Sequence, residues 1–450
     1  MKNIRKIVSI LLSIIIIMFF PKLSICQDNK KNFHIDKNSE SGSAWNEYWK
    51  ENREFPTQIC ITPGNNETVL NFSWYSKDKE ASSKLKIYED NKISKLIQVS
   101  SINLGNGFIS NKAEIENLKA NKKYYYSYTI NGKWTEKILL ERKDSDKFSF
   151  IFMGDPQIGS SYKSKNLSSH EEGIKIDAYN WNKAIEKALD KVDKCSFIIC
   201  GGDETNTKND YSNKNKEEIS KMEYCGFLCP DYLRFTPIAN AIGNHDKDNI
   251  DFYYHFNVPN SSKLGSTKAG SDYYFTYKNA IFLVLNTNNL NIEEHKKFIE
   301  ETINKNSSMQ WKIAVFHHDI YGCGIHSDDI EVKLLREKLP QVLEENNISL
   351  VFNGHDHIYS RSYKLYQEKI VEDMTNNSKG TIYITGGSST GSKFYKSSKD
   401  NKEYIGENFE KEVPTYTTVD ITKDMVSINT YRIDTNGPID DIITIKNKNN

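Results

Sequence analysis

The stretch FSFIFMGDPQ, residues 148–157, joins a short apolar run to a polar segment that begins with Gly154 and Asp155. A nearly continuous apolar run of this length is typical of a strand that is buried on both faces of a sheet. Asp155 therefore stands just past the end of a buried strand. Because side chains at the carboxyl ends of parallel strands converge in one crevice, we expect a functional site here.

Further apolar runs follow, and helical patterns lie between several of them. The helices are expected at residues 177–192, 293–303 and 330–343, and the strands at 197–200, 236–242, 281–285, 313–316, 350–352 and 382–385. Two alternating strands close the chain at 416–421 and 425–433. Alternating strands and helices indicate an α/β domain, which we place at residues 146–450.

The residues before this domain show a different pattern of apolar and polar side chains. Short strands with period-two alternation are expected at residues 68–75, 85–88, 112–115 and 124–130, and Asn131-Gly132 is a hairpin signal. Short alternating strands over this length predict a small β-sandwich, which we place at residues 55–145.

The N-terminus carries a targeting signal. Lys2, Arg5 and Lys6 precede an apolar run over residues 7–20 that is short for a membrane-spanning helix, so we expect a signal peptide over residues 1–26. An uncleaved membrane anchor is the alternative, and it is the one way in which we expect the chain to meet a membrane. Residues 27–54 are interpreted as a polar linker. The predicted location is secreted, extracytoplasmic or at the cell surface. Export also permits disulfides, for which Cys225 and Cys229 are the nearest pair.

Six stretches place Asp, Asn and His where apolar runs stop. They are Gly154-Asp155-Pro156-Gln157, Gly202-Asp203, Gly243-Asn244-His245-Asp246, His317-His318, His326 and Gly354-His355-Asp356-His357. Six of the ten histidines lie in them. Mixed oxygen and nitrogen donors of this kind suit two transition-metal ions, and a hydroxide held between such ions can attack phosphorus.

These motifs resemble those of the calcineurin-like metallophosphoesterases, and more closely those of the purple acid phosphatase branch. That family shows GD-x-G, GD-x-x-Y, GNH-[DE], V-x-x-H and GH-x-H in this order. The corresponding segments here are residues 154–157, 202–206, 243–246, 314–317 and 354–357. The branch also carries an N-terminal fibronectin-III-like domain, which matches the predicted sandwich. The resemblance implies an αββα catalytic sandwich after residue 146.

The resemblance also implies roles for individual residues. Asp155 and His357 would bind the first metal, Asp203 would bridge both metals, and Asn244, His317 and His355 would bind the second. His245 would contact the substrate phosphate and be oriented by Asp246. His326 would face the leaving group and donate a proton to it.

Two positions depart from the family pattern. Asn206 stands where the branch has the tyrosine that gives it colour, and Gln157 stands where it has Gly. Asn206 or Gln157 could complete the first metal's ligand set, and His318 could be a ligand or a neighbour of the ligands. We therefore expect a colourless centre of two divalent or mixed-valence ions of Fe, Mn or Zn.

The leading hypothesis is an exported acid phosphatase-like hydrolase that acts on small phosphomonoesters. A phosphodiesterase or nucleotidase with the same centre is the first alternative, and a catalytically silent cell-surface binding protein is the second. Net charge is zero, so the composition gives no sign of nucleic-acid binding.

Overall fold

The computed structural model describes residues 42–447 except 55–57, 78–81, 91, 131, 143–144, 210–211, 374, 376–378 and 401. The predicted signal peptide lies outside these residues, as does most of the predicted linker. Within the described ranges, no helix combines the length and the apolar character needed to cross a membrane.

The end of the predicted linker is a helix rather than an extended segment. Helix α2 (Ser43–Asn52) buries Trp45 and Trp49. The Trp45 indole donates to the backbone oxygen of Lys175 at 3.3 Å, and its ring meets that of Tyr179 edge-on. Residues 27–54 are mostly polar, so these two aromatic residues did not change the prediction of a linker. Their burial attaches helix α2 to the α/β part.

A β-sandwich follows and confirms the prediction for this part of the chain. Its first sheet has the order β1-β2-β6-β5, with β1 (Cys60–Pro63), β2 (Leu70–Lys77), β5 (Val99–Asn103) and β6 (Phe108–Ile115). Its second sheet has the order β4-β3-β7-β8, with β9 also paired to β7; the strands are β3 (Leu85–Glu89), β4 (Lys92–Ile97), β7 (Lys122–Ile130), β8 (Lys133–Trp134) and β9 (Ile138–Arg142). All pairings are antiparallel. Apolar side chains of both sheets, including Phe72, Trp74 and Tyr126, form its core.

Backbone groups after helix α6 (Ile250–His255) pair with the sandwich. The backbone oxygen of Asn257 accepts from Thr62 Oγ1 at 2.7 Å and from Asn71 Nδ2 at 2.8 Å. The ring of His255 stacks 4.1 Å from that of Tyr75 and 4.3 Å from that of Tyr224. His255 is therefore a packing residue.

The α/β part contains two mixed sheets. The first has the order β12-β11-β10-β22-β23-β24, with β10 (Phe148–Met153), β11 (Cys195–Cys200), β12 (Ile238–Asn240), β22 (Thr415–Ile421), β23 (Met425–Arg432) and β24 (Ile443–Lys446). The second has the order β13-β14-β15-β16-β20-β17-β21, with β13 (Tyr273–Tyr277), β14 (Ala280–Leu285), β15 (Trp311–Phe316), β16 (Leu350–Asn353), β17 (Tyr359–Ser362), β20 (Ile382–Thr385) and β21 (Ile405–Phe409). A small hairpin, β18 (Leu365–Tyr366) and β19 (Lys369–Ile370), lies outside them.

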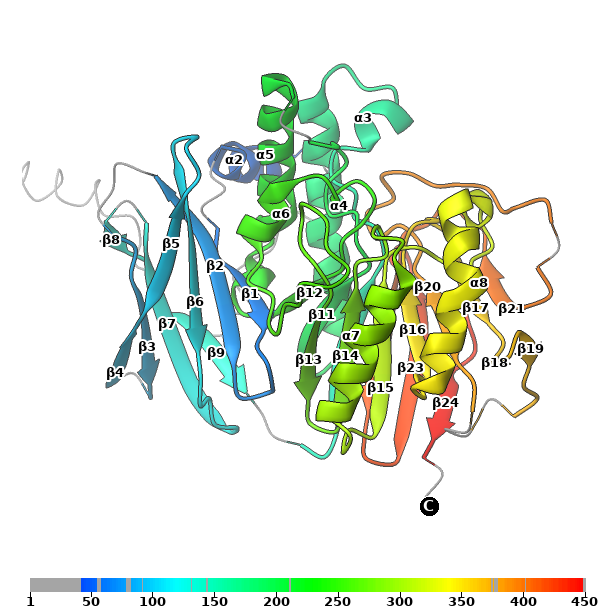
Figure 1. The fold of residues 1–450 in the computed structure, drawn as a ribbon. Coiled ribbons are helices and arrows are strands. Elements are labelled where there is room, and N and C mark those ends of the chain that lie inside the picture. The colour runs from blue at the N-terminus through cyan, green and yellow to red at the C-terminus, as the bar shows by residue number, and fades with distance from the viewer. Residues whose placement is uncertain are drawn as a thin grey trace, which may run out of the picture. The chain divides into compact units, whose positions relative to one another are not determined.

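The two sheets pack face to face with helices outside, as Figure 1 shows. Phe150, Phe197 and Phe282 meet in the core between the sheets. Helices α7 (Ile292–Lys305) and α8 (Ile330–Glu345) cover the outer face of the second sheet, with Phe298 and Leu335 in that layer's core. Helices α4 (His170–Lys191) and α5 (Lys214–Leu228) pack together, and α4 contacts β22 of the first sheet. The observed architecture is the expected αββα sandwich.

Helix α4 begins seven residues before the predicted start at Asp177. Ser169 caps it by accepting from the Glu172 backbone N–H at 3.2 Å, and Ser168 donates to the Glu172 carboxylate at 2.7 Å. These two hydrogen bonds cap the first turn of α4, where backbone N–H groups have no acceptor within the helix. The first turn lacks apolar periodicity, so the sequence pattern did not include it. The segment between β10 and Asp177 thus contains the start of α4 and the short helix α3 (Ser161–Ser164).

The expected disulfide between Cys225 and Cys229 is wrong, because neither of these cysteines forms a disulfide in the structure. The Cys229 thiol donates to the Gly226 backbone oxygen at 3.1 Å and accepts from Asn182 Nδ2 at 3.0 Å. Both cysteines belong to the end of helix α5, and the polar contacts of Cys229 direct its sulfur away from a bridge.

Candidate metal centre

Three buried side chains from three different strand ends come together at one edge of the α/β sandwich. Asp155 follows β10, Asp203 follows β11 and His317 follows β15. His317 Nε2 lies 3.6 Å from Asp203 Oδ1, and His317 Nδ1 lies 4.0 Å from Asp155 Oδ1. One ligand atom from each residue fits within 4.8 Å of the others, so the three can hold a metal ion.

Two further donors face His317. Its Nε2 lies 3.1 Å from Asn244 Oδ1 and 3.2 Å from His355 Nδ1. The other nitrogen, Nδ1, lies 3.0 Å from the Gly201 backbone oxygen, so a neutral His317 carries its proton there and presents a lone pair at Nε2. Oxygens of Asn244 and Asp203 therefore both face His317 Nε2, and a metal ion or a proton on that nitrogen can join the three side chains.

His357 reaches the same centre from the other side of Asp155. Its Nε2 lies 3.1 Å from Asp155 Oδ2, and its Nδ1 donates to the Lys393 backbone oxygen at 2.8 Å. A backbone acceptor on one ring nitrogen fixes the tautomer that leaves the other nitrogen free for a metal. Asp155 Oδ1 is buried without a hydrogen-bond partner, which is a further free donor for an ion.

Four residues at this edge have strained backbones. The φ angles are +38° at Gln157, +52° at Asp203, +78° at His355 and +55° at His357. Non-glycine residues rarely adopt this left-handed region, and its cost of about 1–3 kcal/mol per residue is typical of functional sites. The strained positions coincide with the residues that the motifs single out.

Glycine is required beside the ligands for close approach. A Cβ at Gly354 would stand 2.0 Å from Asp155 Oδ1, and one at Gly202, where φ is +96°, would stand 2.8 Å from His317 Nδ1. Glycine has no Cβ, so its backbone can lie this close to the side-chain atoms of Asp155 and His317. This explains the glycines that directly precede Asp203 and His355.

The electrostatics also favour a cation. Burial disfavours a charged His317, yet the carboxylates of Asp203 and Asp155 outweigh it and raise the pKa of His317. Burial opposes ionisation of Asp203, but His317 and His245 outweigh it and lower the pKa of Asp203. Burial and the imidazoles of His318 and His317 hold the pKa of His355 well below its usual value. The carboxylates of Asp155 and Asp203, together with the neutral imidazole of His355, form a donor set that fits divalent ions.

Comparisons with known proteins agree with this geometry. Residues 148–359 match the calcineurin-like phosphoesterase family. The chain is 22% identical over 372 residues to Fe(3+)-Zn(2+) purple acid phosphatase 12 of Arabidopsis thaliana, which covers 75% of this chain and 73% of that protein. A second match, purple acid phosphatase 17 of the same plant, is 45% identical over 53 residues and spans only 15% of that protein's length. The fold superposes on a purple acid phosphatase from yellow lupin (Lupinus luteus) seeds with a TM-score of 0.65 at 14% identity, covering 88% of this chain and 75% of that one.

Residues 148–359 form a calcineurin-like metallophosphoesterase domain, and the chain is purple acid phosphatase-like. Its β-sandwich precedes the metallophosphoesterase domain, as the resemblance implied. The buried Asp155, Asp203 and His317 cluster is the candidate metal site of this metallophosphoesterase.

His245 lies at the centre, but Asp246 does not orient its ring. The His245 backbone N–H donates to Asp203 Oδ1 at 2.8 Å, and its ring Nδ1 hydrogen-bonds the Asn206 backbone oxygen. Asp246 instead accepts from the Gly243 backbone N–H at 2.9 Å and from Thr205 Oγ1 at 3.5 Å. The turn between Gly243 and Asp246 directs that carboxylate inward, so the expectation that it orients His245 is wrong.

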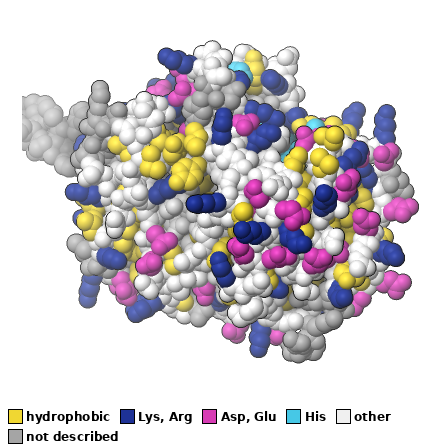
Figure 2. Space-filling model, viewed as in Figure 1, with side chains coloured by type: hydrophobic (Ala, Val, Ile, Leu, Met, Phe, Trp, Pro, Cys, Tyr) yellow, Lys and Arg dark blue, Asp and Glu magenta, His cyan; other side chains and the backbone are white. Residues whose placement is uncertain are grey.

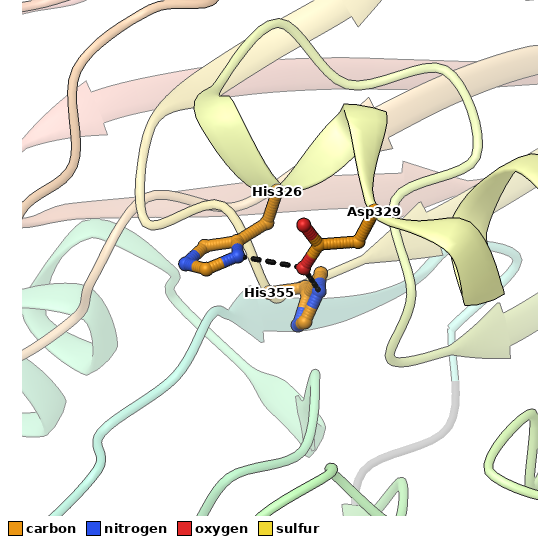
Figure 3. Close-up of side chains that lie close together, drawn as sticks. All are labelled: His326, Asp329 and His355. Atoms are coloured by element: carbon orange, nitrogen blue, oxygen red, sulfur yellow. Dashed lines mark hydrogen bonds and ion pairs between the residues drawn. The ribbon is translucent and has the colours of Figure 1, made fainter.

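His326 lies beside His355, with ring centroids 5.2 Å apart. Figure 3 shows Asp329 between the two imidazoles, with its Oδ2 2.8 Å from His326 Nδ1 and 4.0 Å from His355 Nε2. His326 is the more accessible of the two histidines, because 28% of its side chain is exposed and only 10% of that of His355. His326 is therefore placed where a substrate leaving group can reach it.

The remaining sequence candidates occupy different parts of this metallophosphoesterase site. Gln157 is buried, and its Nε2 donates to Asp203 Oδ2 at 3.4 Å while its Oε1 has no partner. Asn206 touches the site through its backbone oxygen, and a ligand role for its side chain stays a prediction. His318 is adjacent to the ligands and bonds Thr287 Oγ1 at 2.8 Å through Nδ1. Burial, with His317 beside it, lowers the pKa of His318 to about 3.

Sequence reasoning missed three residues at the site. Asp329 could have been found from its spacing, because it follows His326 by one helical turn. Lys393 and Tyr395 had no such signal, since they come from an irregular segment after β20. The Tyr395 ring lies 4.4 Å from that of His326 and 4.9 Å from that of His357. Only the folded chain brings these two residues to the metallophosphoesterase centre.

Proposed function

We propose that this chain is an exported, metal-dependent phosphoesterase that hydrolyses small phosphomonoesters. The observation that carries the proposal is the convergence of His317 Nε2, Asn244 Oδ1 and Asp203 Oδ1 beside Asp155 at one buried point. The similarity to purple acid phosphatases supports phosphate esters as substrates.

The donor set divides into two positions that share one carboxylate. Asp155 and His357 would hold the first ion, with Gln157 or Asn206 as a further oxygen donor. Asn244, His317 and His355 would hold the second, and Asp203 would serve both. Bound ions would supply Lewis acidity, which stabilises negative charge that develops on the phosphoryl oxygens. The curated relative named as an Fe(3+)-Zn(2+) enzyme supports iron and zinc, and Mn stays a candidate for this chain.

Two histidines would act directly on the ester: His245 would orient it, and His326 would protonate its leaving group. His245 is held through its backbone N–H and its Nδ1, so its Nε2 is the nitrogen left for a phosphoryl oxygen. His326 is held through Nδ1 by Asp329, so its Nε2 is the nitrogen left to protonate the leaving oxygen. In-line attack by a water-derived nucleophile, as the sequence motifs imply, would place the phosphorus between these two imidazoles.

Export is proposed from the charged and apolar residues at the N-terminus. N-terminal sequencing of the secreted product from a cell that expresses the full chain tests it. Cleavage near Gln27 is expected. A product that starts at Met1 and sediments with membranes would contradict cleavage and support the anchor.

The catalytic proposal is tested with protein reconstituted separately with Mn, Fe and Zn. Hydrolysis of p-nitrophenyl phosphate should exceed that of bis(p-nitrophenyl) phosphate, and a chelator should abolish both. Faster diester hydrolysis would favour the phosphodiesterase alternative. Stoichiometric metal with hydrolysis of neither ester would favour the silent binding protein.

A further inference from the structure

Two carboxylates, Asp177 on helix α4 and Glu223 on helix α5, are fully buried. On the face seen in Figure 2, by contrast, acidic side chains lie at the surface among basic ones. Taking a carboxylate out of water costs free energy unless hydrogen bonds replace the lost water. The hydrogen bonds that Asp177 and Glu223 accept therefore indicate what these carboxylates hold in place.

Asp177 holds the loop that follows β10. Its Oδ2 accepts from the Gly159 backbone N–H at 2.9 Å and from the Ser161 backbone N–H at 3.1 Å, and its Oδ1 accepts from the Ser161 hydroxyl. The same loop begins with the candidate metal donor Asp155. Asp177 thus fixes the far end of the segment that carries this donor.

Glu223 holds the loop that follows β11 in a similar way. Its Oε2 accepts from the Thr207 backbone N–H at 2.8 Å, and its Oε1 accepts from the Thr207 hydroxyl at 2.7 Å. This loop begins with Asp203. Glu223 also lies against the loop after β10, because a Cβ at Gly159 would stand 2.3 Å from Glu223 Oε1. The two carboxylates therefore lie on either side of Gly159, where the two loops meet.

The two loops also hydrogen-bond to each other. The Gln157 backbone N–H donates to the Asp203 backbone oxygen at 2.8 Å, and the Asn206 backbone N–H donates to that of Ile158 at 3.0 Å. Gln157 and Asp203 have the positive φ angles of +38° and +52°. Such conformations persist only where the surrounding structure fixes them. The loop pairing and the two buried carboxylates provide that constraint.

The second metal position depends on other parts of the chain. Its candidate donors Asn244, His317 and His355 follow strands β12, β15 and β16. Among the described residues, neither carboxylate hydrogen-bonds to the segments 243–246, 316–318 and 354–357. The constraint from helices α4 and α5 thus acts on the loops of Asp155 and Asp203.

We propose that Asp177 and Glu223 are positioning residues for the first metal position. They hold the two loops in the arrangement in which Asp155 and Asp203 face one ion, so their removal weakens binding of the first ion more than binding of the second. This inference rests on the two metal positions of the proposed function. A role confined to packing of helices α4 and α5 would affect both positions alike.

The test measures Zn²⁺ binding by calorimetry in two variants of the full chain. Asn244→Ala keeps the first position, and His357→Ala keeps the second. Glu223→Ala and Asp177→Ala are added to each of them in turn. The affinity of each position is then read without interference from the other.

Conservative and control variants accompany these changes. Each carboxylate accepts backbone N–H groups on one oxygen and a hydroxyl on the other, so an amide can accept the former and donate to the latter. Glu223→Gln and Asp177→Asn should therefore keep the affinity of the first position. Glu218→Ala and Asp190→Ala, which are exposed changes on helices α5 and α4, are the controls.

In the Asn244→Ala background, we expect Glu223→Ala or Asp177→Ala to weaken Zn²⁺ binding by about 10–100-fold. In the His357→Ala background, the loss should be smaller. Equal losses in the two backgrounds would overturn the proposal, and so would unchanged affinity in both. If thermal melting shows that the alanine variants unfold, Thr207→Val replaces them. It removes only the hydroxyl partner of Glu223 and should show the same selectivity on a smaller scale.

Hydrogen–deuterium exchange of the metal-free protein separates this inference from the proposed function. Glu223→Ala should speed exchange in residues 154–161 and 203–207 more than in residues 243–246, and Glu223→Gln should not. If the unmodified chain binds no Zn²⁺, the proposed function fails and the exchange pattern decides the role of the carboxylates. Unchanged exchange in both loops would overturn the proposal.

Discussion

His326 donates a hydrogen bond from Nδ1 to Asp329 Oδ2 at 2.8 Å, and this carboxylate oxygen also lies 4.0 Å from His355 Nε2. The His326 backbone N–H donates at 2.9 Å to Asp356 Oδ1, so ring and backbone are both held by carboxylates. His326 thus has a defined orientation at the mouth of the site even though it is partly exposed.

Removal of Asp329 should weaken proton donation to the leaving group. We expect Asp329→Ala to lower kcat by about tenfold for an alkyl phosphate, whose leaving oxygen needs a proton, and less for p-nitrophenyl phosphate. Steady-state kinetics with both esters checks this. Asp328→Ala is the control, because Asp328 pairs with Lys402 rather than with the histidine. Equal losses for both esters would argue against proton donation through His326.

Loss of Asn244 should empty one metal position. Asn244→Ala removes an oxygen that lies 3.1 Å from His317 Nε2, so we expect about one ion fewer per chain and a fall of about 10–100-fold in kcat/KM. Elemental analysis and kinetics on the same sample check it. Asn304→Ala, on the exposed side of helix α7, should change neither. Full activity of Asn244→Ala would refute the ligand assignment.

Iron-loaded protein should lack an intense visible band. Asn206 replaces the expected tyrosine, and a neutral amide gives no phenolate-to-metal charge transfer. Absorption spectroscopy before and after reduction checks this, and Asn206→Tyr should introduce the band. If the unmodified protein is coloured, Tyr395→Phe shows whether the nearby Tyr395 is the source, because its ring lies 4.9 Å from that of His357.

Folding stability should fall at alkaline pH because of Glu223. Burial raises the pKa of Glu223 from 4.5 to about 8, although its carboxylate accepts from the Thr207 N–H and hydroxyl. The folded state therefore binds a proton that the unfolded state has released. The resulting stabilisation is fully present below about pH 4.5 and is lost as pH rises through about 8.

Glu223→Gln should flatten this dependence. The amide keeps an acceptor for the Thr207 N–H and carries no charge, so we expect higher thermal stability than the unmodified chain at about pH 9 and little difference at about pH 5. Thermal unfolding at both pH values checks it. Glu218→Gln, an exposed change on the same helix, is the control. Parallel pH dependence of Glu223→Gln and the unmodified chain would contradict the assignment.

The strand-end motifs could be identified from the sequence because a buried strand is a local run of apolar residues. The continuous apolar run before Gly154 and the polar residues after it depend on positions that are close in the chain. The same is true of the alternating strands of the β-sandwich. Segments whose structure depends on distant partners were misread: Trp45 and Trp49 dock helix α2 in a stretch that looks like a linker, and the cap at Ser169 starts α4 early.

Burial periodicity and glycine-donor pairs are local properties, so the order of the layers and the set of candidate metal donors could be predicted from the sequence. The contacts that group and orient these donors depend on the tertiary structure. In the folded chain, Asp246 accepts a hydrogen bond from the Gly243 backbone N–H, and Asp329 accepts one from the His326 ring. Lys393 and Tyr395 both contact His357. Such contacts form between loops of two packed sheets, and no spacing along the chain encodes the distance between loops that meet only after the sheets have packed.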